Sequence, residues 1–240
     1  MDVFYPESSF GGFTRCDGTV AFYQRVNALL GSDFTVLDVG CGRGEYGEDS
    51  VDSRRVLRVL RGKCQRVIGL DRDRVAADNP FLDEFRLIDA DRWPVDDESV
   101  DLCLADNVLE HLEEPERLFT ECGRVLRSGG CLCIRTPNTL GYATAMAQLI
   151  PNAAHAALLR RVQPRRNAAD VFPTLYRCNT QRRLHAALTV NGFEACVFGY
   201  GTEPSYLEFS KIAYALGAAW ASVAPSCVQN TLFAFARRVG

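Results

Sequence analysis

One stretch near the start of the chain, residues 34–47 (FTVLDVGCGRGEYG), constrains the fold more than any other. It opens with apolar, partly β-branched residues, which predict a buried strand. The strand leads into a turn with glycine at alternate positions, Gly40, Gly42 and Gly44. Glycine accepts positive φ angles and has no Cβ, so a ligand can approach the bare backbone. We expect a helix after the turn, with its free N–H groups facing the turn, which is the nucleotide-binding corner of a doubly wound α/β sheet.

Two interpretations of this corner compete, beside the plain alternative of a tight loop without a ligand. The pattern G-x-G-x-x-G from Gly42 to Gly47 fits a dinucleotide-binding fingerprint, but one match of this kind is weakly diagnostic. The other interpretation starts the turn at Gly40, which places Asp38 inside the end of the strand. A strand that ends in D-x-G-x-G-x-G resembles motif I of the class I S-adenosylmethionine-dependent methyltransferases.

Composition narrows the possible partners and locations. The chain has 240 residues, 47% hydrophobic and 24% charged, which is ordinary for one soluble globular domain. Its net charge of -3, with both signs interspersed, gives no electrostatic reason to expect a nucleic acid partner. The most apolar windows, 139–159 and 205–223, are interrupted by proline or charged residues, so we expect no stable membrane insertion. The ten cysteines form no C-x-x-C pair, and we interpret Cys103, Cys131 and Cys133 as reduced, buried thiols of a cytoplasmic protein.

Acidic residues follow the next predicted strands. Residues 66–71 form the second strand, and Asp71 ends it, where an acid can accept both hydroxyls of a ribose. An ordinary surface aspartate is the alternative for Asp71. Residues 85–91 are interpreted as the third strand with its exit turn, and residues 100–105 as the fourth strand, followed by Asp106.

Residues 99–138 extend the resemblance to the methyltransferases over several ordered motifs. They contain an aspartate-bearing strand, Val-Leu-Glu-His-Leu, a predicted helix 115–126 that ends in Arg-Val-Leu, a Gly-Gly turn and Thr-Pro-Asn. With the two earlier motifs, the resemblance covers residues 34–138. It implies S-adenosylmethionine as the cofactor, with an adenine site at Asp89-Ala90. The cofactor-binding residues expected from it are Asp38, Gly40, Cys41, Gly42, Asp71, Arg72, Asp89, Ala90, Asp91 and Asp106.

The resemblance implies a Rossmann-like α/β fold: a seven-stranded, mostly parallel sheet with helices on both faces and an antiparallel last strand. We expect a single domain over 1–240, with an N-terminal arm 1–18 and a lid insertion 139–180, because so long a segment within a compact domain is usually functional. The other expected helices are 20–30, 54–60, 181–190 and 204–220, and the other expected strands are 131–136, 193–200 and 231–237.

The helix 204–220 carries an apolar stripe, which we interpret as core, with a membrane-surface helix as the alternative. The stripe consists of Phe209, Ile212, Ala213, Leu216 and Trp220.

The resemblance implies methyl transfer to a small-molecule acceptor, such as a sugar, a phenol or another natural-product or lipid precursor. His111 is the candidate general base, against the alternative that it only packs at a helix entry. No His, Asp and Glu cluster has metal-ligand spacing, so we expect no metal. Two other functions stay open. One is a catalytically silent S-adenosylmethionine-binding partner subunit. The other is a nicotinamide-dependent oxidoreductase, although we find no Tyr-x-x-x-Lys relay of the kind that such an enzyme would need.

Overall fold

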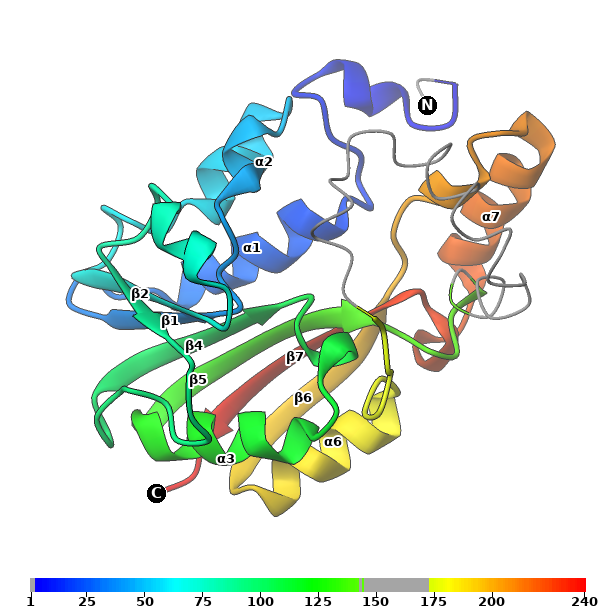
Figure 1. Cartoon of the computed structure of the whole chain (residues 1–240). Helices are drawn as coiled ribbons and strands as arrows, with labels where there is room; N and C mark the ends of the chain where they lie inside the picture. The colour runs from blue at the N-terminus through cyan, green and yellow to red at the C-terminus, as the bar shows by residue number, and fades with distance from the viewer. Residues whose placement is uncertain (1–2, 143, 145–172) are drawn as a thin grey trace.

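The computed structural model describes residues 3–142, 144 and 173–240, and these are built around one seven-stranded sheet with the order β3-β2-β1-β4-β5-β7-β6 (Figure 1). The strands are β1 (Thr35–Val39), β2 (Arg66–Asp71), β3 (Glu84–Leu87), β4 (Val100–Asp106), β5 (Leu126–Pro137), β6 (Phe193–Tyr200) and β7 (Thr231–Arg238). The α-helices are α1 (Gly18–Leu29), α2 (Asp52–Arg58), α3 (Pro115–Val125), α6 (Gln181–Val190) and α7 (Lys211–Val223). Short 3-10 helices are η1 (Pro6–Ser9), η2 (Glu45–Glu48), η3 (Arg74–Asp78), η4 (Leu109–His111), η6 (Ser205–Leu207) and η7 (Ser226–Val228).

The sheet is mostly parallel, as predicted. The pairs β1–β2, β1–β4, β2–β3 and β4–β5 are parallel, while β7 lies antiparallel between β5 and β6. The arrowheads of β5 and β7 point in opposite directions in Figure 1. The predicted Rossmann-like fold with an antiparallel last strand is therefore confirmed.

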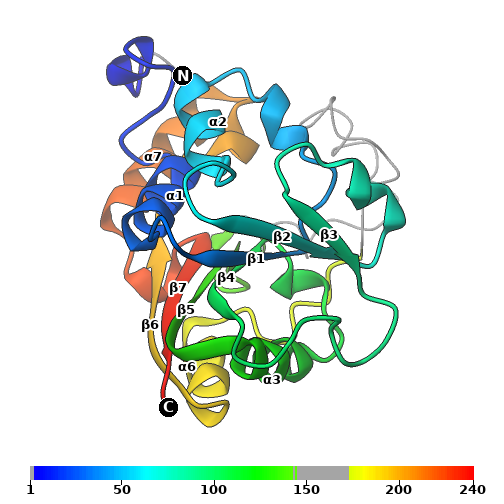
Figure 2. The ribbon, with the colours of Figure 1, turned by 90° about the vertical axis from the view of Figure 1, so that its left-hand side faces the viewer.

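Helices cover both faces of the sheet and create two apolar layers. Figures 1 and 2 show α1 and α2 on one face and α3 and α6 on the other. Phe22 of α1 packs on Phe233 of β7, with ring centroids 5.2 Å apart, while Phe119 of α3 and Leu184 of α6 are fully buried on the opposite face. Strands buried on both faces need near-continuous apolar sequence, which is why the central strands were recognisable.

The chain order reverses at β1, which lies between β2 and β4. In open α/β sheets, ligands bind outside the carboxyl ends of the strands at such a switch point. The glycine turn follows β1 directly, so the fold places it at this position.

The α-helix predicted over 54–60 after the glycine turn is α2, which begins at Asp52 and ends at Arg58. The residues between the turn and this helix include the short η2, so the helix does not start directly at the turn. The Asp49 side chain accepts a hydrogen bond from the Val51 N–H (2.9 Å), and Val51 has an extended backbone. Local bonding of this kind competes with helix formation, which explains the delayed start.

Strand β5 begins earlier than predicted. Leu126 already pairs with Val100, and the register shifts before Leu102 pairs with Cys131. The predicted Gly-Gly turn therefore lies in an irregularity of the strand rather than before it. Between these two pairs β4 advances from residue 100 to 102 and β5 from 126 to 131, so the extra residues of β5 are unpaired and the ladder is locally broken.

The interpretation of the apolar stripe, Phe209 together with residues of α7, as core was wrong. Phe209, Ile212, Leu216 and Trp220 are 74%, 76%, 68% and 45% exposed. The helix begins after Ser210, whose side chain accepts from the Ala213 N–H, and the preceding residues form the separate η6.

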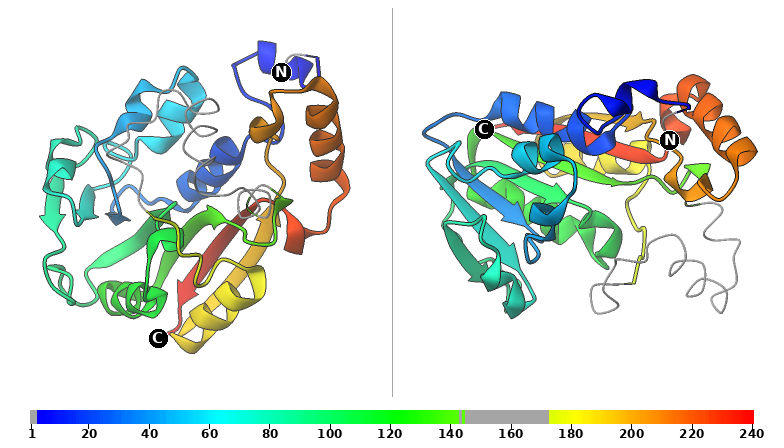
Figure 3. Two further views of the ribbon diagram at one scale, coloured as in Figure 1. Left: turned by 45° about the vertical axis from the view of Figure 1, so that its right-hand side comes forward. Right: turned by 90° about the horizontal axis from the view of Figure 1, so that it is seen from above.

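Helix α7 packs through a different face, which centres on Tyr214. The Tyr214 ring lies 5.0 Å from Phe4 and 6.3 Å from Tyr5 in the N-terminal arm. Figure 3 shows the arm beside α7 in both views. Helical periodicity shows which residues share a face, but not which face meets the protein, so the sequence pattern could not decide this point.

The cysteines and the apolar segments were the subject of two predictions from composition. Cys103 and Cys133 are buried in the sheet as expected, whereas Cys131 is only half-buried, and the ten cysteines, all in the described part of the chain, are free. Within the same residues, every helix is too short or too polar to cross a bilayer.

Replacing Leu216 with Ala should lower the free energy of unfolding by less than about 1 kcal/mol, because its side chain already contacts solvent. The matched change Leu184→Ala on α6 should cost about 2–5 kcal/mol, because that side chain is fully buried. Urea denaturation of both variants measures the difference. A loss at Leu216 as large as that at Leu184 would show that the stripe is covered in solution.

Candidate cofactor-binding site

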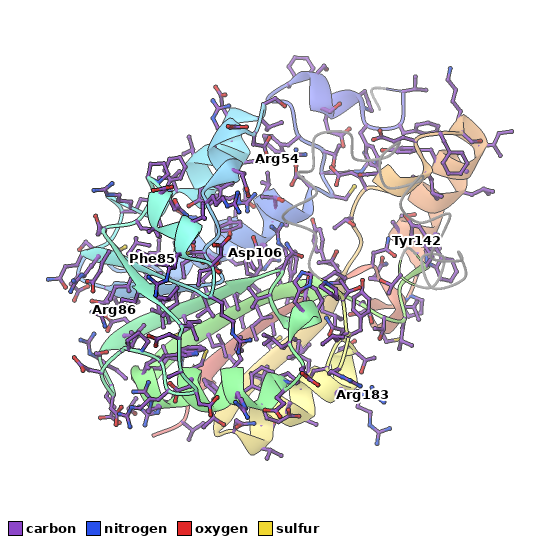
Figure 4. All side chains as sticks on the ribbon, viewed as in Figure 1. Arg54, Phe85, Arg86, Asp106, Tyr142 and Arg183 are labelled. Carbon is purple, nitrogen blue, oxygen red and sulfur yellow. The ribbon has the colours of Figure 1, made fainter. Side chains whose placement is uncertain are left out.

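Three acidic residues meet at the carboxyl edge of the central strands. Asp38 lies near the end of β1, paired in register with Gly69 of β2, while Asp71 and Asp106 end β2 and β4. Figure 4 shows Asp106 in the space between the sheet and the helical layer that contains Arg54. Parallel strands bring their carboxyl ends together, so the sequence positions of these acids determine that they converge.

Hydrogen bonds to β2 fix the glycine turn. The Gly40 N–H donates to the Leu70 carbonyl (2.7 Å), and the Gly42 N–H donates to Oδ2 of Asp71 (3.1 Å). The predicted ribose-binding acid and the predicted glycine turn are therefore in direct contact.

Asn79 supports the turn from the other side, and sequence analysis missed it. Its Nδ2 donates to the carbonyls of Cys41 (3.1 Å) and Gly42 (3.2 Å), and the Asn79 side chain is buried. Cys41 is also buried, which raises the pKa of its thiol. No motif marks Asn79, because it becomes relevant only when the segment after β2 folds back over the turn.

The three glycines of the turn have different surroundings. A Cβ on Gly40 would lie 2.5 Å from Val108, and one on Gly44 would lie 2.7 Å from Asn79. At Gly42, with φ of +55°, no atom lies within 4 Å of the Cβ position. The backbone therefore faces open space at Gly42, as a turn that cradles a ligand requires.

The Asp71 carboxylate can accept further hydrogen bonds from a ligand. It is half-buried, and its Oδ1 accepts from the Asp73 N–H (2.9 Å). A carboxylate has about four lone-pair sites, so two backbone donors leave room for two hydroxyls. The neighbouring Arg72 side chain is exposed.

The predicted adenine-site residues lie beyond the end of β3. Asp89, Ala90 and Asp91 are all exposed. Asp91 forms an ion pair with Arg117 of α3. Their roles toward a cofactor stay predictions.

Asp106 forms a buried ion pair that sequence analysis missed. Arg135 of β5 donates from Nε to Oδ1 and from Nη2 to Oδ2, both at 2.6 Å, and the Tyr23 hydroxyl donates to Oδ2 at 2.8 Å. The Asp106 and Arg135 side chains are 8% and 10% exposed. Burial opposes ionisation of Asp106, but the charge and hydrogen bonds of Arg135 outweigh it and hold the pKa of Asp106 below its usual range. An arginine inside the apolar strand 131–136 was the available signal. The predicted contact of Asp106 with cofactor stays a prediction.

In contrast, nearby groups offset the negative charge of the Asp38 carboxylate only weakly. Burial, and then the negative charge of Asp106, raise the pKa of Asp38 from 3.8 to about 7, although the positive charge of Arg58 acts in the opposite direction. Among the described residues, no side-chain hydrogen bond to the half-buried Asp38 carboxylate is present. This carboxylate therefore lacks a close cation.

His111 lies at the end of η4, close to the described C-terminal part of the predicted insertion 139–180. Its Nδ1 is 3.0 Å from the Pro173 carbonyl. A carbonyl only accepts, so Nδ1 is the donor, and in the neutral ring Nε2 is the basic nitrogen.

The neighbouring Glu110 connects η4 to the same segment. It is buried, accepts from the Thr136 hydroxyl (2.9 Å), and its backbone carbonyl accepts from Leu175 (2.7 Å) and Tyr176 (3.2 Å). Burial raises the pKa of Glu110. In the ranges 3–142, 144 and 173–240, no three His, Cys, Asp or Glu residues are placed to hold a metal ion.

Comparisons with known proteins agree with this geometry. Residues 37–134 match the family model described as a methyltransferase domain. A probable S-adenosylmethionine-dependent methyltransferase of Mycolicibacterium smegmatis is 36% identical over 127 residues, which cover 50% of this chain and 44% of that protein. The chain therefore matches less than half the length of that relative.

Two solved structures share the fold. The cyclase SpnF has a TM-score of 0.57 at 19% identity, with 92% of this chain and 81% of that chain covered. Geranyl diphosphate C-methyltransferase from Streptomyces coelicolor, in complex with Mg²⁺, geranyl diphosphate and S-adenosyl-L-homocysteine, has a TM-score of 0.54 at 18% identity, with 92% and 78% covered. Identities this low show the fold alone.

The fold, the matched motifs and the family model lead to one class. Residues 37–134 match a methyltransferase domain, the matched sequence is similar to S-adenosylmethionine-dependent methyltransferases, and the sheet has the fold of solved methyltransferases. S-adenosylmethionine is the cofactor of this class, and the open backbone at Gly42 beside Asp71 fits it.

Gly42→Ala should weaken S-adenosylmethionine binding at least about tenfold, because the new methyl group would enter the open space beside the turn. Gly62→Ala is the matched control, since Gly62 also has a positive φ and open surroundings but lies after α2. Both variants should lose about 1–2 kcal/mol of stability to backbone strain. Calorimetry should show the affinity loss only at Gly42, and an equal loss in both variants would contradict this assignment.

The Asp38 carboxyl should make the unliganded protein less stable as pH rises. Between its ordinary pKa of 3.8 and its raised pKa of about 7, the folded state keeps a proton that the unfolded chain releases. Asp38→Asn removes this dependence, so the melting temperature of the variant minus that of wild type should grow from about pH 4.5 to about pH 8. A constant difference over this range would show that Asp38 ionises normally in the folded protein.

Proposed function

We propose that this protein transfers a methyl group from S-adenosylmethionine to a small-molecule acceptor. The observation that carries the proposal is the direct contact between the open turn residue Gly42 and Asp71. At Gly42 a ligand can approach the backbone closely, and the adjacent Asp71 carboxylate can accept hydrogen bonds from the hydroxyls of a ribose. Its position at the switch point of the sheet, within the matched methyltransferase segment, supports the same activity.

The protein's contribution would be mainly positional. S-adenosylmethionine, when bound, supplies an activated methyl group on a positively charged sulfur. Asp71 would hold the ribose, the turn at Gly42 would let the ligand lie against backbone, and Asp89 would receive the adenine amino group. Correct alignment of two reactants is worth up to about 7–11 kcal/mol of the barrier in favourable cases.

His111 is the proposed base if the acceptor is a hydroxyl or a protonated amine. The Pro173 carbonyl fixes the proton on Nδ1, so Nε2 would take the proton that the acceptor loses. The acceptor would keep the methyl group, and the donor would leave as a neutral thioether.

The acceptor class rests on indirect support. The net charge of -3 disfavours nucleic acid, and the similar geranyl diphosphate C-methyltransferase acts on a small molecule. A sugar, a phenol or another natural-product or lipid precursor fits this class, and we expect a cytoplasmic protein. The predicted lid 139–180 falls mostly outside the described residues and stays part of the proposal, as does the single-domain organisation with an arm over 1–18.

A silent S-adenosylmethionine-binding subunit is the rival function. The fold is also shared by SpnF, which is named as a cyclase, so the fold does not by itself require methyl transfer. Donor binding without transfer of labelled methyl to any acceptor mixture would favour this rival. Binding of a nicotinamide cofactor in place of S-adenosylmethionine would favour an oxidoreductase.

Asp71→Asn should weaken the binding free energy of S-adenosylmethionine by about 1.5–3 kcal/mol, because charge-assisted hydrogen bonds to the ribose become neutral ones. Asp33→Asn, at an exposed position before β1, is the control and should bind like wild type. Calorimetry measures both, and a labelled-methyl assay on acceptor mixtures tests turnover. Unchanged affinity at Asp71 would remove the ribose assignment.

A further inference from the structure

Helix α7 carries a line of exposed apolar residues along its outer side. The line consists of Ile212, Leu216, Ala219 and Val223, and we call it the outer seam. All four residues are exposed, Val223 to 78%. Figure 3 shows α7 at the margin of the molecule in both views. The outer seam is therefore accessible to a partner.

The spacing of the outer seam favours a helix as the partner. Its members follow one another at intervals of four, three and four positions, which is the pattern by which two helices pack side chains into each other's gaps. The opposite side of α7 attaches it to its own protein. Tyr214 is buried against the N-terminal arm, and a Cβ on Gly217 would lie 2.7 Å from Leu207. Packing on the outer seam would leave these contacts intact.

The charges of α7 favour a second copy of this chain over a lipid surface. Lys211, the first residue, is the only charged side chain of the helix. A helix that lies on a membrane usually has lysine and arginine along its polar face, and α7 has no such row. Among the described residues, Lys211 forms no ion pair or hydrogen bond, and the last turn of α7 contains no basic residue. The carbonyls at that end therefore lack a cation, which stabilises a helix C-terminus.

We propose that two copies of this protein form a dimer in which their α7 helices pack antiparallel through the outer seam. A two-fold axis beside the middle of α7 brings Leu216 to Ala219 of the second copy and Ile212 to Val223 of the second copy. Each contact then occurs twice, as a closed two-fold interface requires. A large side chain faces a small one at the first contact, so the two helices can approach closely.

The same arrangement pairs the charges that α7 leaves open. Lys211 becomes level with Ala224 of the second copy, which is the C-cap of the other α7. Its ammonium group can then lie beside carbonyls that have no cation of their own. A parallel arrangement would place the two Lys211 residues side by side, where like charges repel. The charges therefore favour the antiparallel arrangement.

The proposed dimer is a weak one and does not depend on the proposed function. Helix α7 has 13 residues, a length of about 20 Å, so one helix pair buries less than the roughly 1,200–2,000 Å² of a standard stable interface. We expect a dissociation constant between about 1 µM and 1 mM. Urea denaturation below this range acts on separate copies, so the small effect predicted above for Leu216→Ala refers to the monomer.

Sedimentation equilibrium of the full chain up to about 1 mM tests the dimer. Wild type should pass from monomer to dimer as concentration rises. Leu216→Glu should raise the dissociation constant at least about tenfold, because the dimer would bury two unpaired carboxylates. Val190→Glu, at an 86% exposed position on α6, is the matched control and should associate like wild type.

Two further variants test the antiparallel arrangement. Adding Ala219→Lys to Leu216→Glu should recover at least about threefold of the lost affinity, since each glutamate would face a lysine of the other copy. In a parallel pair, glutamate would face glutamate and nothing would be recovered. Lys211→Glu should weaken the dimer at least about threefold, yet should not lower the melting temperature of the monomer, because a negative charge suits the start of its own helix.

Four results would overturn the proposal. Wild type could stay monomeric up to about 1 mM, or Leu216→Glu could associate like wild type, which would assign the dimer to another surface. The double variant could recover no affinity. Wild type could bind phosphatidylcholine and phosphatidylglycerol vesicles as a monomer while Leu216→Glu does not, which would make a lipid surface the partner. If Leu216→Glu does not fold, the seam is covered within one chain, and an unchanged dimer in Lys211→Glu would then reject the proposal independently.

Discussion

The compensation of negative charge at the carboxyl edge is the interaction on which the rest of the site depends. Parallel pairing of β1 with β2 and β4 brings Asp38, Asp71 and Asp106 to one edge, and like charges in a partly buried place oppose folding. The negative charge of each acid is compensated by different groups. Arg135 neutralises Asp106 with two hydrogen bonds, backbone N–H groups bind Asp71, and Asp38 is left with the weakest compensation.

Because the charges are compensated unequally, some of these residues stabilise the fold and others remain available to a ligand. The Asp106–Arg135 pair is bidentate and buried, so removal of either partner would leave an isolated charge inside the protein, which is strongly destabilising. It fixes β4 to β5 next to the glycine turn. Asp38 and Arg58, by contrast, have capacity that the protein does not use itself. A site of this kind is held in shape before the ligand arrives, which reduces the ordering cost of binding.

Much of the fold was predictable, because its signals are local. Strands β2 and β6 and helix α6 have the predicted bounds, since each is a short periodic segment with a clear stop such as Asn191-Gly192. The glycine turn and the acids that follow the strands were likewise visible as motifs. The start of α2 was not, because it depends on a side-chain bond from Asp49, and the start of β5 was not, because it depends on pairing with Val100.

The sequence by itself determined the order of strands and helices, the chemistry of the glycine turn and the match of residues 37–134 to a methyltransferase domain, because these depend on neighbouring residues and their spacing. Only the tertiary structure decided which side chains surround that turn. Arg135, Asn79 and Arg58 come from β5, the segment after β2 and the end of α2, and no local pattern relates them. The same limit applies to α7, which begins at Lys211 rather than at the predicted residue 204 and whose apolar residues face outward, because the face that packs contacts the N-terminal arm. Periodicity is a property of one segment, whereas contact is a property of two.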